Sequence, residues 1–261
     1  MRASDYEFFD PPFAAMAHRG GSLMADNFAR ENTLHAFANA VELGYRYIET
    51  DVQATRDGVL VTFHDDDLER VSGEAGQIKD LTWADIQAVL VGGAEPIPSL
   101  DEVLDAFPTL RINIDMKAEG TLEPLIETIR RHGAENRVCV ASFSTSRLRR
   151  FRKRTRNAIA TAASPWGVGV ACLAPMTIPR FHSPAPVWQM PLSTIVAGCE
   201  IRLFGTRMLN ELHRLGKRVH IWTIDDAETM HRLIDVGVDG IVTDRPDTLR
   251  EVLLARGMWF E

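Results

Sequence analysis

Short apolar runs alternate with helical patterns along nearly the whole chain. Each run is followed by a segment whose apolar residues recur at three- and four-residue spacing, or by a stretch long enough for a helix. This order is typical of βα units around a parallel sheet. The expected strands cover residues 13–20, 45–52, 110–117, 137–143, 157–163, 186–192, 218–224 and 238–244. Strands in this number and order predict an α/β fold, the (β/α)8 TIM barrel.

Capping and stop residues set the expected helices. The first helix is predicted to begin at Thr33 and to stop at Gly44. Between residues 45–52 and 58–65 the chain is too short for a helical crossover, so Asp57-Gly58 is predicted to form a tight hairpin that adds an accessory strand. The other helices are expected at residues 82–90, 99–107 and 121–132, before Gly216, from Ala227 and from Pro246.

Length and composition are those of an ordinary soluble domain. Of the 261 residues, 45% are hydrophobic and 25% are charged, which allows a sizeable core. There is no linker or internal repeat, so residues 1–261 are predicted to be a single domain with its barrel core at about 14–256. The net charge of −7 argues against a nucleic-acid partner, which would need basic side chains for the phosphates.

The amino terminus and the cysteines bear on location. The first residues, MRASDYEFFDPP, lack the apolar core of a signal peptide, and no apolar run reaches the roughly 18 residues of a membrane span. A cytoplasmic protein without stable membrane insertion is therefore expected. Cys139, Cys172 and Cys199 are odd in number and have no C-x-x-C spacing, so we interpret all three as small buried hydrophobic residues.

Two carboxylates share one face of the second expected strand. Glu49 and Asp51 are two residues apart, and side chains on a strand alternate between its faces. At the carboxyl end of a barrel strand this face is the mouth of the barrel, where two carboxylates repel each other unless a cation lies between them. Oxygen ligands favour Mg²⁺ or Ca²⁺. Pairing with arginines at the rim explains the two residues equally well.

Two histidines end strands at the same rim. His18 ends the first expected strand and His64 ends the accessory strand. A lone histidine at a strand end is more often structural, but two beside an acidic cluster can divide general acid and general base roles. Asp65 either orients His64 or caps the following turn.

The next strand adds a carboxylate and a lysine. Asp115 and Lys117 lie on one face at the end of residues 110–117. A third carboxylate would complete a metal site, and the lysine would neutralise an anionic substrate oxygen. Displacement at a phosphodiester needs a neutralised phosphate, a deprotonated nucleophile and a protonated leaving oxygen, which a metal, Arg19, Lys117 and the two histidines supply together.

Several segments together resemble the glycerophosphodiester phosphodiesterase family. AHRG, ENTLHAF, IETDVQATRDGVLVTFHDDDLERVSG, IPSLDEVL, INIDMK, ASFS, IWTIDD and GVDGIVTDRP occur in the family's order from about Ala17 to Pro246. H-R-G, E-x-D, T-x-D-G and H-D are specific only in combination. The resemblance implies a TIM barrel that hydrolyses glycerophosphodiesters to glycerol 3-phosphate and an alcohol with one divalent cation, Mg²⁺ or Ca²⁺.

The resemblance also implies residue roles. His18 and His64 match the acid/base histidines, Arg19 and Lys117 match residues around the phosphate, and Trp222 matches an aromatic residue of the glycerol pocket; the metal ligands are Glu49, Asp51 and Asp115. Many members have Glu where Asp115 stands, so Glu119 or a bridging water is an alternative source of the third ligand. Attack by the glycerol hydroxyl, which gives a cyclic phosphate, and direct attack by water both remain open.

Other polar residues receive structural interpretations. Glu31 and Asn32 are expected to hold their loop, and Asp244 to cap the last helix. In residues 146–156, SRLRRFRKRTR, seven Arg and Lys are expected on the outer face of a helix, either solvated or as a patch for anionic membrane or phosphate. His35, His132, His213 and His231 are expected on helices, whereas His182 and His220 are left unassigned.

Two further functions compete with the leading one. A lysophospholipase D, or a related phospholipase, would need an apolar route for an acyl chain, which residues 179–191 could supply. The other is a barrel that binds metal and phosphate without turnover. In each case the expected partner is a small molecule, and a homodimer stays open because no interface can be identified.

Overall fold

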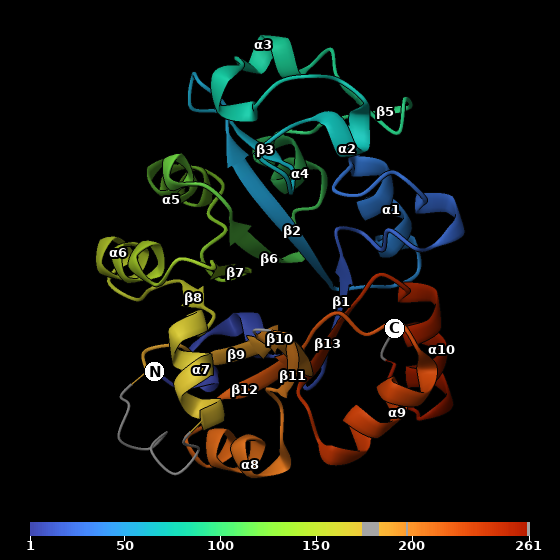
Figure 1. Ribbon diagram of the computed structural model, residues 1–261, viewed down its shortest axis with the longest axis vertical. Coiled ribbons are helices and arrows are strands. Elements are labelled where there is room, and N and C mark those ends of the chain that lie inside the picture. Colours follow the sequence, from blue (N-terminus) through green and yellow to red (C-terminus); the bar gives the residue numbers. More distant parts are fainter. Residues whose placement is uncertain (174–182, 197, 260–261) are drawn as a thin grey trace.

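Eight parallel strands form the barrel of the computed structural model, which describes residues 1–173, 183–196 and 198–259 (Figure 1). The strands follow one another in the order β8, β7, β6, β2, β1, β13, β12 and β9, and a bridge between Ala162 and Val187 closes the ring. The predicted barrel is confirmed. Its strands are β1 (Ala14–His18), β2 (Tyr47–Ala54), β6 (Arg111–Met116), β7 (Val138–Ala141), β8 (Ala160–Thr161), β9 (Val187–Met190), β12 (Arg218–Ile221) and β13 (Gly240–Thr243).

Helices surround the strands. The side chain of Thr33 accepts a hydrogen bond from the amide of Ala36, as predicted for the cap of α1. The helices are α1 (Leu34–Glu42), α2 (Glu69–Ser72), α3 (Trp83–Ile86), α4 (Leu100–Ala106), α5 (Leu122–Arg131), α6 (Thr145–Thr155), α7 (Pro165–Leu173), α8 (Thr206–Arg214), α9 (Ala227–Val236) and α10 (Pro246–Ala255), with 3-10 turns at Ala3–Asp5, Glu7–Phe9, Ala25–Asn27, Ile78–Asp80 and Glu119–Thr121. Among the described residues, no helix combines the length and apolar character needed to cross a membrane.

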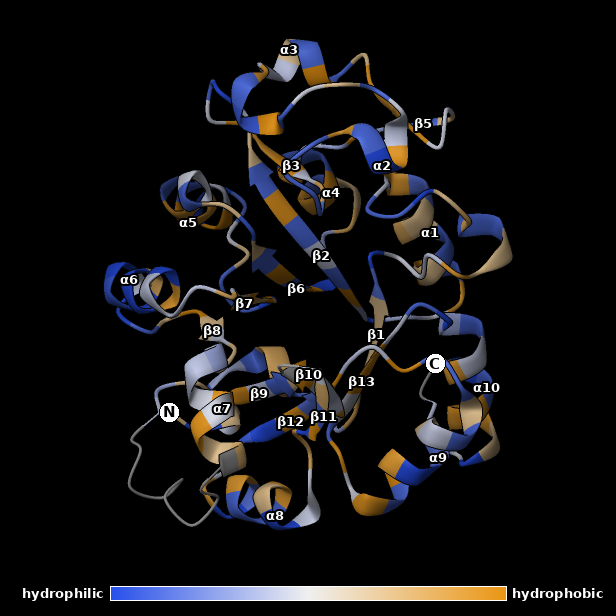
Figure 2. Cartoon of the chain, in the orientation of Figure 1, coloured by the Kyte–Doolittle hydropathy of each residue, from blue (hydrophilic) through white to orange (hydrophobic). Residues whose placement is uncertain are grey.

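Apolar side chains form three separate cores. The largest lies between the outer helices and the barrel wall, so the helices in Figure 2 carry both hydrophobic and hydrophilic residues. The second fills the barrel itself, where Met16 and Tyr47 meet Phe8 and Phe9 of the amino-terminal segment. The third lies under the insertion that follows β2.

The insertion after β2 begins with the predicted hairpin. β3 (Leu60–Thr62) pairs antiparallel with β2 after the turn at Gly58, whose φ is 84°. The prediction of one helix over residues 82–90 is wrong in its second half. Helix α3 ends at Ile86, and β4 (Leu90–Val91) pairs with β5 (Glu95–Pro96) across a turn at Gly92 and Gly93, both with positive φ; this pairing takes Leu90 out of the helix.

Two elements after β8 have no counterpart in the predictions. Helix α7, PWGVGVACL, contains no charged residue and therefore lacks the amphipathic period that identifies a surface helix. The second is the hairpin of β10 (Ser193–Val196) and β11 (Cys199–Arg202). Cys199 is exposed on it, so its predicted burial is wrong; Cys172 is half-buried and only Cys139 is fully buried. His182 lies outside the described residues.

Candidate active site

The strand register brings His18, Glu49, Asp51 and Asp115 together at the carboxyl end of the barrel. His18 of β1 is the register partner of Glu49 on β2, and Asp51 is the partner of Asp115 on β6. Side-chain alternation turns all four into the barrel. Together with Lys117 they line a cavity of about 680 Å³.

A turn that requires glycine places Arg19 next to these residues. Arg19 has a φ of 52°, and Gly20 follows with a φ of 88°. A Cβ on Gly20 would lie 2.8 Å from the backbone carbon of Ala36, so only glycine fits between the turn and α1. The turn directs Arg19 back toward β2, where its Nε lies 3.1 Å from Oδ2 of Asp51, and Glu31 holds its other end at 3.0 Å.

Asp51 is surrounded by cations. Lys117 Nζ lies 2.8 Å from an oxygen of Asp51 and 2.8 Å from an oxygen of Asp115. Asn32 donates a hydrogen bond to the other oxygen of Asp51 at 3.1 Å. Burial raises the pKa of Asp51, but the charges of Lys117 and Arg19 outweigh it and hold that pKa below its ordinary value. Cation pairing, the alternative considered for the two carboxylates, thus describes Asp51.

Glu49 has no comparable partner in the described part of the chain. There its Oε2 is buried without a hydrogen bond, and the nearest ionisable nitrogen is His18 Nε2 at 3.7 Å. Burial, followed by repulsion from Asp51, raises the pKa of Glu49 to about 8. Asp115 also has a buried oxygen, Oδ1, without a partner, and burial raises its pKa. These buried carboxylate oxygens call for an additional cation.

The donor set fits a divalent metal ion of the Mg²⁺ or Ca²⁺ class. Its atoms are carboxylate oxygens from Glu49, Asp51 and Asp115, and the oxygens without partners on two of them are what a cation would satisfy. Within the described residues, however, no three such groups already form a metal-binding cluster. The ammonium group of Lys117 instead lies within 2.8 Å of an oxygen of each of the two aspartates.

His18 is held by a residue that the sequence misassigned. Its Nδ1 is 2.9 Å from Asp244 Oδ1, which also accepts a hydrogen bond from Ser22 at 2.8 Å. The predicted helix cap at Asp244 is wrong, because the cap position of α10 is Arg245. Burial lowers the pKa of His18, but the bond to Asp244 and the charge of Glu49 outweigh it and raise that pKa. With Nδ1 engaged, Nε2 remains for the cavity.

His64 has a matching acidic partner. Asp65 Oδ1 lies 2.5 Å from His64 Nδ1, so Asp65 orients the imidazole. Arg70 of α2, a residue that sequence reasoning did not single out, binds Asp65 at 2.5 Å and Glu31 at 2.6 Å. Glu31 therefore connects the supports of His64 and Arg19, in agreement with its predicted loop-holding role.

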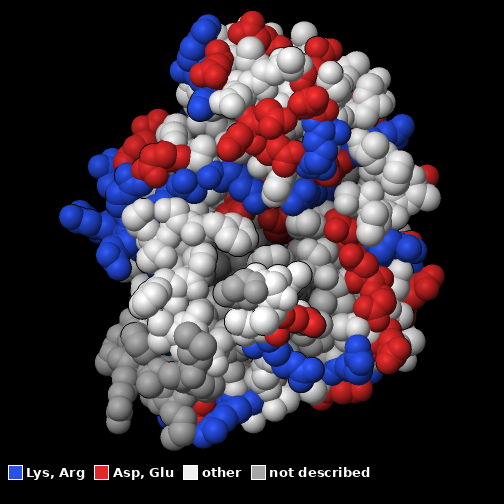
Figure 3. Space-filling model, in the orientation of Figure 1, with Lys and Arg blue, Asp and Glu red and all other residues white. Residues whose placement is uncertain are grey.

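The opposite side of the cavity is largely apolar. Trp222 lines it, as predicted, and packs edge-on against Phe143 with ring centroids 6.1 Å apart. In Figure 3 the hollow near the centre of this face has charged residues along its upper rim and mainly uncharged residues below. Other uncharged lining residues are Ala163, Pro165, Val168, Met190, Ile201 and Leu203. His220 does not line the cavity; it is fully buried, and burial lowers its pKa to about 4.

Only some of the basic side chains of α6 lie on its outer face. Arg147 is buried and donates to the backbone carbonyls of Met116 and Lys117, so it secures the end of β6. The prediction that all seven basic residues lie on the outer face is wrong for Arg147, and also for Arg152, which is half-buried and donates to Thr161 and Ala162 of the barrel wall. Glu119, the alternative metal ligand, forms an ion pair with Arg150 and is absent from the lining of the cavity.

Comparisons with known proteins identify the family of this chain. A model of the glycerophosphoryl diester phosphodiesterase family matches residues 18–248. A probable glycerophosphodiester phosphodiesterase 2 of Mycobacterium tuberculosis is 41% identical over 94% of this chain and 92% of its own length. The human lysophospholipase D GDPD1 is 25% identical over 91% of this chain and 85% of its own.

Solved structures show the same fold. The crystal structure of a glycerophosphoryl diester phosphodiesterase homologue from Silicibacter pomeroyi has a TM-score of 0.77 at 22% identity and covers 98% of this chain and 99% of its own. A phosphodiesterase of Oleispira antarctica, in complex with the product sn-glycerol-3-phosphate, has a TM-score of 0.74 at 23% identity and covers 92% of this chain and 96% of its own. The chain belongs to the glycerophosphoryl diester phosphodiesterase family and is an enzyme of that class.

Proposed function

We propose that this enzyme hydrolyses glycerophosphodiesters to glycerol 3-phosphate and an alcohol, with His18 and His64 as its acid/base pair and a Mg²⁺ or Ca²⁺ ion as its cofactor. One observation carries the proposal. Two histidines, each held at Nδ1 by a carboxylate, line the same cavity as Arg19 and Lys117. General acid and general base are thus available on either side of a site for an anion.

The charge of the cavity supports a divalent cofactor. With all three lining carboxylates ionised, as metal binding requires, they exceed the two lining cations, Arg19 and Lys117, by one negative charge, and a phosphodiester would bring a second. A divalent cation held by Glu49, Asp51 and Asp115 balances both. When bound, it would neutralise the phosphate and favour ionisation of the attacking oxygen. Lys117, no longer the partner of both aspartates, would then contact the phosphate.

The histidines move the protons. Asp244 and Asp65 fix the Nδ1 atoms of His18 and His64, so each Nε2 is the atom that accepts or donates in the cavity. One imidazole takes the proton of the attacking hydroxyl, from the glycerol or from water, and the other protonates the leaving alcohol. If the glycerol hydroxyl attacks, the product is a cyclic phosphate, and water then opens its ring to give glycerol 3-phosphate, with the two histidines moving protons in the reverse sense. Arg19 neutralises a phosphate oxygen, and Trp222 forms the wall against which the glycerol packs. The bound product of the Oleispira antarctica enzyme supports this choice of product.

The test is release of glycerol 3-phosphate from a panel of glycerophosphodiesters with Mg²⁺, with Ca²⁺ and with EDTA. We expect release that EDTA abolishes. His18→Ala and His64→Ala should each abolish turnover while Mg²⁺ or Ca²⁺ still binds by calorimetry, whereas Glu49→Gln should weaken that binding. His213→Ala, an exposed histidine of α8, is the control and should retain activity. Near-normal rates in either His18→Ala or His64→Ala would contradict the acid/base assignment. Release of glycerol 3-phosphate that resists EDTA would contradict the proposed metal cofactor.

A second candidate follows from the apolar half of the cavity. Its uncharged wall, from Ala163 and Val168 to Met190 and Leu203, offers a lysophospholipid a place for the start of its acyl chain. The human relative is a lysophospholipase D. Lysophospholipids therefore belong in the same assay. If they react and glycerophosphodiesters do not, lysophospholipase D becomes the activity; binding of both without release would contradict both hydrolase proposals.

A further inference from the structure

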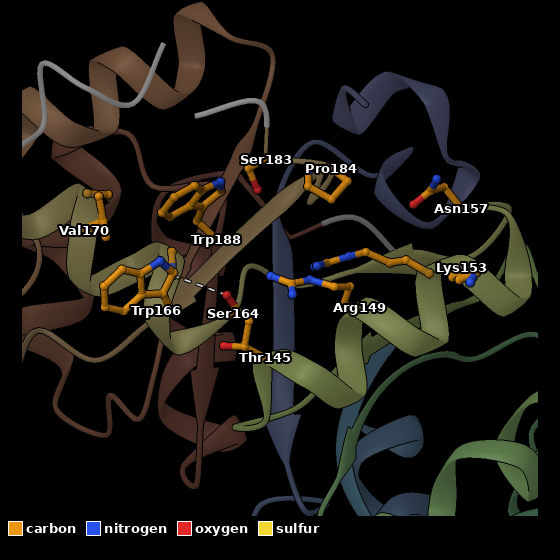
Figure 4. Close-up of a pocket in the computed structure, with 13 residues that line it drawn as sticks. Thr145, Arg149, Lys153, Asn157, Ser164, Trp166, Val170, Ser183, Pro184 and Trp188 are labelled. Atoms are coloured by element: carbon orange, nitrogen blue, oxygen red, sulfur yellow. Dashed lines mark hydrogen bonds between the residues drawn. The ribbon is translucent and has the colours of Figure 1, made fainter. Parts of the chain in front are cut away.

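A second cavity, of about 460 Å³, lies between helices α6 and α7 (Figure 4). Trp188 of β9 and the preceding Ser183 and Pro184 complete it, and we call it the α6–α7 pocket. Helix α7 separates it from the catalytic cavity. Residues such as Val168 line the catalytic cavity, whereas Trp166 and others line the α6–α7 pocket, and the two linings share no residue. The two cavities can therefore be tested separately.

The α6 side of the pocket is positively charged. Arg149, Arg152 and Lys153 line it, and the described lining residues include no Asp or Glu. In Figure 4 the Arg149 side chain extends from α6 toward the α7 side of the pocket. Arg149 and Lys153 are exposed and form no ion pair within the described part of the chain, whereas Arg152 is held by Thr161 and Ala162. Two positive charges are thus available to a ligand.

Two other basic residues of α6 show that the unpaired positive charge is confined to one side of the helix. Arg150 and Arg154, each one residue further on, pair with Glu119 and Glu123 next to α5. A basic helix that served only solubility would have no need of this division. The paired side stabilises the contact with α5, and the side facing the pocket keeps its charge.

The α7 side of the pocket is aromatic and apolar. Trp166 has 71% of its surface exposed, an unusual state for the largest apolar side chain. Trp188, on the same side of the pocket, is only 2% exposed, and its indole Nε1 has no hydrogen-bond partner among the residues that the structure describes. Val170 and Pro184 extend the apolar wall. A buried donor without a partner and an exposed tryptophan beside free cations are features of a binding site rather than of a packed interface.

We propose that the α6–α7 pocket is a second binding site of the enzyme, for an anionic amphiphile that carries a phosphate head and an adjoining alkyl chain. Arg149 and Lys153 bind the phosphate, which charge-assisted hydrogen bonds favour. Trp166, Trp188 and Val170 cover the alkyl chain, whose transfer from water supplies further affinity. The site is independent of the catalytic cavity, and the proposal does not rest on the function proposed for that cavity.

Titration of the intact protein with octyl phosphate, inorganic phosphate and octanol, followed by tryptophan fluorescence and calorimetry, tests the site. Because both halves of the pocket contribute, octyl phosphate should bind at least about tenfold more tightly than either of the others. Trp166→Phe should remove most of the fluorescence change and leave the calorimetric signal measurable. The inorganic phosphate arm separates a simple phosphate site from one that recognises a lipid-derived head with its chain.

The decisive variants lie on the two sides of α6. Arg149→Gln/Lys153→Gln should weaken octyl phosphate by about tenfold or more, because it removes both free cations. Arg150→Gln/Arg154→Gln, with the same change of charge on the paired side, is the matched control and should bind like the parent. Thermal melts confirm that each variant folds, and the two single variants serve if the double variant does not.

Three results would overturn the proposal. Equal weakening by both double variants would show a diffuse charge effect. Inorganic phosphate binding as tightly as octyl phosphate would show that the aromatic wall does not contribute. Absence of octyl phosphate binding to the parent protein, or binding that Arg149→Gln/Lys153→Gln leaves unchanged, would remove the site.

Discussion

Asp244→Asn is the sharpest test of how the catalytic histidines are held. The substitution keeps the size of the side chain and removes the charge that pairs with His18 Nδ1 at 2.9 Å. A hydrogen bond to a charged group contributes about 1.5–3 kcal/mol. If that contribution is lost from the transition state, kcat should fall by about 10- to 150-fold, since about 1.4 kcal/mol corresponds to a factor of ten.

The pH profile adds a readout that a purely structural role would not move. Asp244 raises the pKa of His18 against the opposing effect of burial, so its removal should lower that pKa. Whichever limb of the kcat profile belongs to His18 should then shift to lower pH. An acidic limb that moves identifies His18 as the base, and an alkaline limb that moves identifies it as the acid.

The assay is release of glycerol 3-phosphate at saturating metal and substrate, together with a thermal melt of each variant. Ser22→Ala is the control, because it removes the hydroxyl that donates to Asp244 at 2.8 Å but leaves the carboxylate beside His18. It should reduce kcat by less than Asp244→Asn. An Asp244→Asn enzyme with the parent kcat and an unshifted pH profile would refute the reasoning. An equal decrease in kcat in both variants would show that Asp244 acts only through packing.

Three other predictions follow from the supports of the site. Arg70→Gln should lower kcat by about two- to tenfold, because Asp65 loses its bond to this partly exposed arginine. Arg131→Gln is the control. It breaks a similar Arg–Asp–His cluster with Asp101 and His132 and should leave kcat unchanged. Gly20→Ala should lower the melting temperature by about 5–15 °C, because alanine is strained at positive φ and its Cβ would contact Ala36. Gly58 also has a positive φ, 84°, but nothing lies within 4 Å of a Cβ there, so Gly58→Ala should lower the melting temperature much less. Equal decreases in the two variants would show that the contact with Ala36 is irrelevant. His220 stays neutral in the fold because burial lowers its pKa from 6.5 to about 4, so the unfolded chain binds its proton first as pH falls. The free energy of unfolding should decrease by about 3 kcal/mol between those values, and His220→Gln should flatten the slope in pH-dependent urea titrations.

The barrel could be predicted because its strands have a local signature. Residues 45–52 and 110–117 are short stretches of apolar residues with charged residues near their carboxyl ends, and each is a strand within a few residues of the expected limits. The short strand β8 has a weaker signature, but it lies within the apolar run of residues 157–163 that predicted it. Helix α7 was missed because a helix with two cavities beside it has no polar face to reveal its period.

The site could be predicted where its members lie two residues apart on one strand. Glu49 with Asp51 and Asp115 with Lys117 needed only the alternation of a strand. Asp244 and Arg70 could not be found in this way. Asp244 lies 226 residues from His18, and only the closing of the barrel between β1 and β13 brings them together. Arg70 belongs to the insertion, whose path across the rim no periodicity describes.

The two halves of the catalytic cavity come from different parts of the barrel, and this bears on substrate choice. Among the described lining residues, every charged side chain, from His18 to Lys117, belongs to β1, β2, β6 or the segments that follow them. The lining residues from Ala141 onward are uncharged and come from β7, α7, β9, the β10–β11 hairpin, β13 and adjoining segments, including Trp222 after β12. On the function proposed above, the charged half binds the phosphate, which all phosphodiesters share. Selection among leaving alcohols then rests on the uncharged half, where an apolar pocket discriminates by only about 1–3 kcal/mol per methylene.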